Sequence, residues 1–205
     1  MPKNIIAVAL FFSSFVCFSA DFVAGQDYEL VQNSDTVEHK VKTPSVMEFF
    51  SFGCPWCYRL EPSVNKWVAK HGSKISFKKI PVVFNKDWEY YARAYYTAEA
   101  LSLNSKLNPA LFKAILDDKQ PLNSNETMIA FLTKNGVDSA TAQSAFNHSP
   151  SIDLDLATSQ QMMASYHITA VPAFVVNNHY KTDLQMAKTE ERLFAILDFL
   201  LAKGK

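Results

Sequence analysis

The stretch SVMEFFSFGCPWC, residues 45–57, decides the fold of this chain. Its first eight residues form a mostly apolar run, which is typical of a buried strand. Cys54 and Cys57 follow at a Cys-x-x-Cys spacing, where apolar periodicity predicts a helix over residues 55–70. A helix start offers unpaired backbone N–H groups and the positive end of the helix dipole, and both favour a thiolate over a thiol. Because the thiolate is the reactive form of cysteine, the stretch predicts a thiol–disulfide exchange site.

The order of the two cysteines suggests different environments for them. Cys54 stands at the helix start and is expected to be the exposed nucleophile, whereas Cys57 lies one turn deeper and is expected to be buried. Pro55 suits the first helical turn, where its missing N–H is not needed. The alternative is half of a zinc site. Zinc usually takes four ligands, and the sequence has no second cysteine pair, so no metal is expected.

The third cysteine, Cys17, lies in an apolar segment near the N-terminus. Residues 1–25 are predicted to be a secretory signal peptide, with small residues that permit cleavage after residue 19, 20 or 25. The alternative is a membrane anchor, which needs about 20 apolar residues, and this run is shorter. After cleavage only Cys54 and Cys57 remain, as in a protein that works in an oxidising compartment without structural disulfides.

Composition and charge exclude several classes of function. Lys and Arg number 20, Asp and Glu also number 20, and the formal net charge is zero. This balance gives no support to nucleic-acid binding or to a polybasic membrane surface. Hydrophobic residues make up 48% of the chain, which is enough to build the core of one globular domain.

Hydrophobic periodicity divides residues 26–205 into strands and helices. Strands are expected at 28–31, 46–52, 75–83 and 173–176, with a return strand at 179–180 after a tight Asn177-Asn178 turn. Helices are expected at 55–70, through most of 87–167 and at 190–202. A helical insert at about 87–149 therefore interrupts a small α/β domain. Its aromatic stripe, Trp88, Tyr91 and Tyr95, is expected to be core rather than a cofactor site.

Two motifs are similar to those of a known family. The sequences VMEFFSFGCPWCY, residues 46–58, and TAVPAFVVN, residues 169–177, resemble the thioredoxin superfamily and, within it, the DsbA-type periplasmic thiol oxidases. The resemblance implies an α/β fold, namely a thioredoxin-like domain with an inserted α-helical domain. It also implies that a Cys54–Cys57 redox disulfide introduces disulfide bonds into exported proteins in the periplasm, without a cofactor.

The resemblance also implies partners and further site residues. Unfolded or reduced exported proteins would be the substrates, and a DsbB-type quinone-linked membrane oxidase would reoxidise the dithiol. Pro172 is implied to follow a cis bond beside the dithiol, and the backbone of Val171 to pair with the substrate. Valine before this proline is the oxidase-like choice. Trp56, Val171 and Phe174 are expected to form an apolar surface that binds unfolded chains.

Glu48 stands out because it interrupts an apolar strand, on the same face as Val46 and Phe50. Burying an unpaired carboxylate is costly, so a partner is needed. Lys79 alternates with apolar residues in the next strand and is the candidate. The family carries a buried Glu and Lys at the matching positions, which implies that the pair accepts a proton from Cys57 or balances its charge. The alternative is a strand-edge glutamate that reaches solvent.

Trp56 is the main departure from the family pattern, because the type member has histidine at this position. Histidine can carry a charge beside the Cys54 thiolate, whereas the indole offers only one neutral N–H. The helix terminus and backbone donors must then supply the stabilisation of the Cys54 thiolate.

Two other functions remain as alternatives. The same fold serves disulfide isomerases and reductases, which need a reducing partner and are often dimers. No long dimerisation segment precedes Tyr28, so a monomeric oxidase is preferred. A function from another class is a non-enzymatic chaperone that holds unfolded exported chains.

Overall fold

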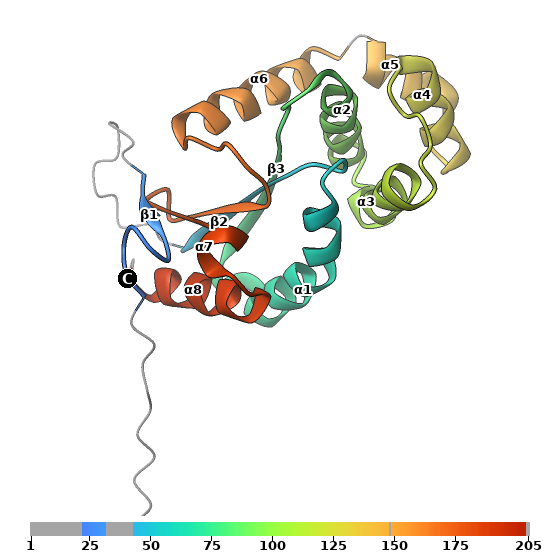
Figure 1. Ribbon diagram of the computed structural model, residues 1–205. Coiled ribbons are helices and arrows are strands. Elements are labelled where there is room, and N and C mark those ends of the chain that lie inside the picture. Colours follow the sequence, from blue (N-terminus) through green and yellow to red (C-terminus); the bar gives the residue numbers. More distant parts are fainter. Residues whose placement is uncertain (1–21, 32–42, 148, 204–205) are drawn as a thin grey trace, which may run out of the picture.

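The computed structural model describes residues 22–31, 43–147 and 149–203 (Figure 1). Residues 1–21 of the predicted signal peptide, with Cys17, lie outside these residues. The last four residues of that prediction, 22–25, are described, and Phe22 packs against Phe199 of the C-terminal helix. In the described part of the chain, a five-stranded sheet forms the centre, in the order β1-β5-β4-β2-β3. Its strands are β1 (Glu29–Leu30), β2 (Ser45–Phe50), β3 (Ser76–Pro81), β4 (Ala173–Val176) and β5 (Tyr180–Asp183). Only β2 and β3 are parallel; the other neighbours run antiparallel.

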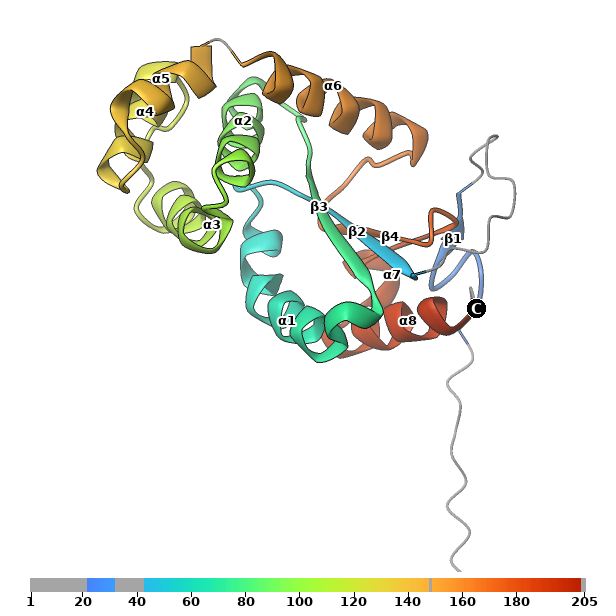
Figure 2. The ribbon, with the colours of Figure 1, turned by 180° about the vertical axis from the view of Figure 1, so that it is seen from behind.

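Helices cover both faces of the sheet (Figures 1 and 2). They are α1 (Pro55–His71), α2 (Lys86–Ala100), α3 (Asn104–Phe112), α4 (Asn125–Lys134), α5 (Ser139–Asn147), α6 (Pro150–Ser165), α7 (Leu184–Ala187) and α8 (Glu190–Lys203). A 3-10 turn (Gly72–Lys74) follows α1, and a π-helical segment (Lys113–Asp117) follows α3. The predicted fold class, an α/β thioredoxin-like domain with a helical insertion, is confirmed.

The pleat of β2 sends alternate side chains to opposite layers. Val46 packs with residues of α1 and α8, such as Leu60 and Leu197. Phe49 packs on the other face, in a cluster that also contains Tyr166. Both faces of the central strand are therefore buried, as its nearly continuous apolar run predicted.

The insert helices have their own hydrophobic core, which reaches the end of β2. Phe50 and Phe52 join a cluster with Tyr95, Phe112 and many other residues of α2 to α6. Trp88 packs at its edge, so the aromatic stripe lies at the core as expected. The insert boundaries at 87 and 149 stay a prediction, because α6 continues from the insert to the far face of the sheet (Figure 2).

Several element ends differ from the sequence predictions. The strand predicted to end at residue 52 ends at Phe50, because the Cys54 N–H donates to the Ser51 carbonyl (3.0 Å) and turns the chain. The four-residue helix α7 was not predicted, since it is too short to show a period. The tight turn is confirmed, with positive φ at Asn177 and Asn178. Within the described residues, no helix is long and apolar enough to cross a bilayer.

Candidate active site

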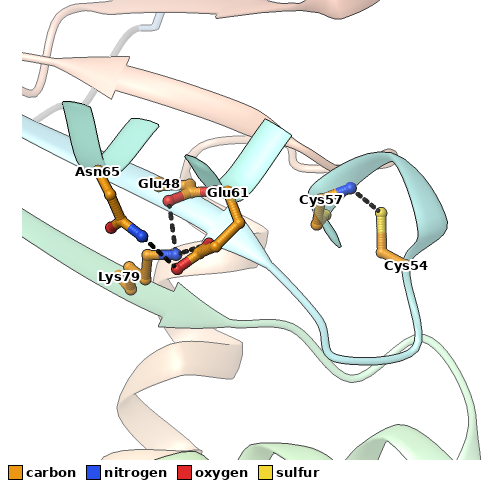
Figure 3. A network of polar contacts seen from close by, with 6 residues as sticks. All are labelled: Glu48, Cys54, Cys57, Glu61, Asn65 and Lys79. Atoms are coloured by element: carbon orange, nitrogen blue, oxygen red, sulfur yellow. Dashed lines mark hydrogen bonds and ion pairs between the residues drawn. The ribbon is translucent and has the colours of Figure 1, made fainter. Parts of the chain in front are cut away.

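Cys54 caps the start of α1, directly after the turn that follows β2. It has extended backbone angles, and its Sγ accepts a hydrogen bond from the Cys57 N–H (3.1 Å; Figure 3). Pro55 occupies the first turn, where no N–H is required. The thiol of Cys54 also donates to the carbonyl oxygen of Val171 (3.5 Å). The sulfur therefore lies between the helix start and the loop before β4.

The surroundings make the two thiols unequal in acidity. A hydrogen bond from the Cys57 thiol lowers the pKa of Cys54, and the backbone N–H groups of Cys57 and Trp56 lower it further. Burial raises the pKa of Cys57 well above its usual value, and the neighbouring Cys54 and Glu48 charges add to this rise. Cys54 is thus the group that ionises first.

Cys54 is more exposed than Cys57, as predicted, but the difference is small and both cysteines are buried. Cys54 is 4% exposed and Cys57 is fully buried, so Cys54 is not the exposed residue that its position suggested. The reason is tertiary: the loop bearing Val171 lies against the Cys54 sulfur.

Glu48 and Lys79 form a buried ion pair to one side of the dithiol (Figure 3). They are register partners in the parallel strands β2 and β3, and the Lys79 Nζ lies 3.2 Å from the Glu48 Oε2. Glu48 is 0% exposed, so the alternative of a solvent-reaching glutamate is wrong. Burial raises the pKa of Glu48 to about 7 in spite of the nearby ammonium. Neither carboxylate oxygen has a partner with hydrogen-bond geometry among the described residues.

Lys79 joins Glu48 to a second carboxylate on α1. Its ammonium donates a hydrogen bond to Glu61, whose side chain is 14% exposed, and the Asn65 amide donates to the same carboxylate (3.3 Å). Burial alone would lower the pKa of Lys79, but the two carboxylates outweigh it and raise that pKa. The cluster therefore extends from the buried Glu48, whose charge acts on Cys57, to the partly exposed Glu61.

The loop before β4 forms the other wall of the site. The bond between Val171 and Pro172 is cis, as the resemblance implied. These two residues line a groove of about 480 Å³ together with residues of α1 and of the segment around α7. The groove residues are Trp56, Arg59, Leu60, Ala170, Val171, Pro172, Asp183, Leu184, Gln185, Lys188, Thr189 and Glu190. Its lining combines apolar residues such as Leu60 and Leu184 with charged residues such as Arg59.

Two members of the predicted apolar surface differ sharply in exposure. Trp56 is 57% exposed, and the Arg59 guanidinium lies 4.7 Å from its ring centroid. Phe174 is 0% exposed and packs in the core with Val176 and α8, so its assignment to the substrate surface is wrong. Strand alternation explains the error, because Phe174 points to the α1/α8 face of the sheet.

Comparison with known proteins identifies the family. Residues 77–200 match the DSBA-like thioredoxin domain family. The chain is 34% identical over 178 residues to the thiol:disulfide interchange protein DsbA of Burkholderia cepacia, which covers 87% of this chain and 84% of that protein. The chain belongs to the DsbA family. It is therefore a thiol:disulfide oxidoreductase.

Solved DsbA structures share the fold. The crystal structure of Pseudomonas aeruginosa DsbA has a TM-score of 0.83 and 29% identity, and the match covers 90% of this chain and 95% of that one. A Proteus DsbA in complex with the non-covalently bound peptide PWATCDS has a TM-score of 0.74 and 26% identity. That match covers 90% of this chain and 99% of the other.

Most site residues that the sequence singled out in this DsbA-family chain meet at one place. Val171 contacts Cys54, and the charge of Glu48, which is paired with Lys79, acts on both cysteines; Phe174 does not join this site. Glu61 was missed, although a helical period already places it one turn after Cys57, on the side that faces the sheet. No group of three or more His, Cys, Asp or Glu within the described residues could hold a metal ion.

Proposed function

We propose that this protein is the oxidising member of a disulfide-forming pathway, and that Cys54 and Cys57 carry the reaction. The observation that supports this direction most is the unequal acidity of the two thiols. A lowered pKa at Cys54 stabilises the reduced enzyme, so the disulfide form tends to take electrons from other thiols.

The reaction is an exchange in two steps. A substrate thiolate attacks the Sγ of Cys54, the Cys54–Cys57 bond breaks, and Cys57 leaves as a thiolate. A second substrate thiolate then attacks the substrate sulfur of the mixed disulfide, and Cys54 leaves as a thiolate. The substrate loses two electrons and two protons and gains a disulfide, while the enzyme disulfide becomes a dithiol. The N–H donors at the start of α1 stabilise the second leaving group.

Glu48 and Lys79 are proposed to manage the proton of Cys57. The Cys57 thiolate released in the first step is buried and takes up a proton readily, because its pKa is high. A carboxyl whose pKa is about 7 is half protonated near neutral pH and is suited to supply that proton. Lys79 and Glu61 connect it to the partly exposed side of α1.

The groove beside Val171 and Pro172 is proposed to hold the substrate chain next to the reacting cysteine. Its apolar residues, with Trp56 exposed at one side, suit an unfolded or reduced exported protein. The Proteus relative binds a cysteine-containing peptide, which supports this class of ligand. A DsbB-type membrane oxidase is proposed to restore the disulfide, and the protein is proposed to act as a periplasmic monomer after loss of its signal peptide.

Stoichiometric oxidation of a peptide tests the proposal. The oxidised protein is mixed with an unfolded peptide bearing two reduced cysteines, and one peptide disulfide is expected for each enzyme disulfide lost. A Cys54→Ser, Cys57→Ser double variant should show none. A chaperone would instead suppress aggregation equally well in the double variant. An isomerase would act only when reduced, on peptides whose disulfides are wrongly paired, and either result would overturn the proposal.

The assignment of the nucleophile has its own test. The reduced protein is treated with a small alkylating reagent at mildly acidic pH, and the modified cysteine is located by mass spectrometry. Cys54 should react first, since its pKa is lowered and Cys57 is fully buried. Preferential labelling of Cys57 would reverse the roles of the two cysteines.

A further inference from the structure

Trp88, on the first turn of α2, lies directly against the residue that precedes the dithiol. A Cβ placed on Gly53 would lie 2.3 Å from Nε1, 3.0 Å from Cε2 and 3.1 Å from Cδ1 of the Trp88 indole. Real side chains do not approach so closely. The indole therefore occupies the volume that any side chain at position 53 would need.

The backbone does not itself require glycine at position 53. Its φ lies outside the left-handed region, unlike that of Gly25, Gly72 and Gly136, so an L-residue could adopt the same backbone angles. The requirement for glycine is therefore one of space, and the indole creates it.

Gly53 belongs to the turn that delivers Cys54 to the start of α1. Its N–H donates to the Ser51 Oγ (3.1 Å), and the Cys54 N–H donates to the Ser51 carbonyl (3.0 Å). The Cys54 sulfur must then lie 3.1 Å from the Cys57 N. Hydrogen bonds weaken as donor and acceptor move apart, so a shift of Gly53 would weaken the contact that stabilises the thiolate.

Trp88 is itself held in place by the helical insert. Its backbone N–H donates to the Asn85 side chain at the start of α2 (3.1 Å), and its ring lies 5.5 Å from that of Phe84, centroid to centroid. The side chain packs against both the insert core and the cluster on the α6 face of the sheet. An indole held in this way can limit how far the backbone at Gly53 moves towards α2.

We propose that Trp88 is a positioning residue for Cys54: its indole, packed on Gly53, holds the turn that places the Cys54 sulfur on the N–H groups of α1. Through this contact the helical insert influences the redox site. The inference rests on the proposed role of Cys54 as the nucleophile.

Two substitutions of Trp88 test the proposal through the acidity of Cys54. Trp88→Ala should raise the pKa of Cys54, measured by the ultraviolet absorbance of the thiolate during a pH titration. It should also shift the glutathione equilibrium towards the oxidised protein, by up to about tenfold for each unit of pKa change. Trp88→Phe, which keeps a flat ring, should lie between Trp88→Ala and the unchanged protein.

Trp67→Ala is the matched control. Trp67 is a buried tryptophan, whereas Trp88 is partly buried. Trp67 lies ten residues beyond Cys57 on α1, about 15 Å along the helix. Its indole N–H donates to Asp198. Its loss should lower the unfolding midpoint and leave the Cys54 titration unchanged. If both tryptophan variants raise the pKa of Cys54 equally, the effect is a general loss of packing and the proposal is wrong.

A double-mutant cycle tests the contact itself. Gly53→Ala should raise the pKa of Cys54 in the wild-type background, and do so far less in the Trp88→Ala background, where the methyl group has room. Equal effects in the two backgrounds would overturn the proposal. If Gly53→Ala alone does not fold, rescue of folding by Trp88→Ala supports the contact, and its absence counts against it.

The outcomes separate this inference from the proposed function. A wild-type protein that does not oxidise peptides refutes the function, whereas the titrations still report on Trp88. If Trp88→Ala raises KM for the peptide and leaves the titration unchanged, Trp88 touches substrate and is not a positioning residue.

Discussion

The ammonium of Lys79 lies 3.2 Å from the carboxylate of Glu48, and both groups are buried to one side of the dithiol (Figure 3). Glu48 keeps a raised pKa even so, because burial outweighs the attraction of the ammonium. A third charged group, Glu61, shares the same ammonium. Glu48 can therefore change its charge near neutral pH while Lys79 remains paired, and this affects both the reactivity and the stability of the protein.

Glu48→Gln should make Cys54 more acidic. The Glu48 charge raises the pKa of both cysteines, so its removal should move the Cys54 thiolate titration to lower pH. The same change should slow the first exchange step at neutral pH, because the proton donor for Cys57 is lost. Stopped-flow mixing with a reduced peptide measures that rate. Glu61→Gln is the control, since it removes the other carboxylate paired with the Lys79 ammonium and leaves Glu48 in place.

Glu48 should also lower stability as the pH rises. Its pKa increases from 4.5 in an unfolded chain to about 7 in the folded protein, so the folded state binds more protons in this window. The contribution of Glu48 to stability is then highest below pH 4.5, falls between pH 4.5 and about 7, and is constant at higher pH. The rise corresponds to roughly 3 kcal/mol. Denaturant unfolding of the reduced protein and of Glu48→Gln at several pH values gives the difference. A difference independent of pH would contradict this account.

The reduced protein should be more stable than the oxidised protein near neutral pH. Reduction frees the Cys54 sulfur to accept the Cys57 N–H as a thiolate at the helix start. The disulfide closes a very small loop and so constrains the unfolded chain little. Unfolding midpoints of the two forms in the same denaturant provide the measurement. A higher midpoint for the oxidised form would indicate a reductase-like protein.

Trp56→His should lower the pKa of Cys54, but Arg59 should limit the effect. Histidine can place a positive charge near the sulfur, which favours the thiolate. The Arg59 guanidinium already lies 4.7 Å from the ring at position 56 and would oppose protonation of the histidine. The effect should therefore be larger with Arg59→Gln added. The titration of Cys54 should move to lower pH, and the glutathione equilibrium should move towards the reduced protein. If neither changes, residue 56 affects only the protein surface that contacts partner proteins.

The sequence by itself determined the parts of this protein that depend on residues close together in the chain. The strand and helix on either side of Cys54, the cap made by that cysteine and the Asn177-Asn178 turn all follow from local periodicity and backbone preference. The Glu48–Lys79 pairing was also within reach, because a buried carboxylate needs a partner and Lys79, unlike Lys78, alternates with the apolar residues of the next strand.

Only the tertiary structure decided which distant side chains meet. Glu61 on α1 is the second carboxylate paired with Lys79. Trp88 of the insert packs against Gly53 in the turn before Cys54. Phe174 points into the core instead of the groove. Periodicity shows which face of an element is apolar, but it does not show which part of another element packs on it. Which elements pack together depends on the close packing of the whole fold, as where the Trp88 indole fills the space beside Gly53.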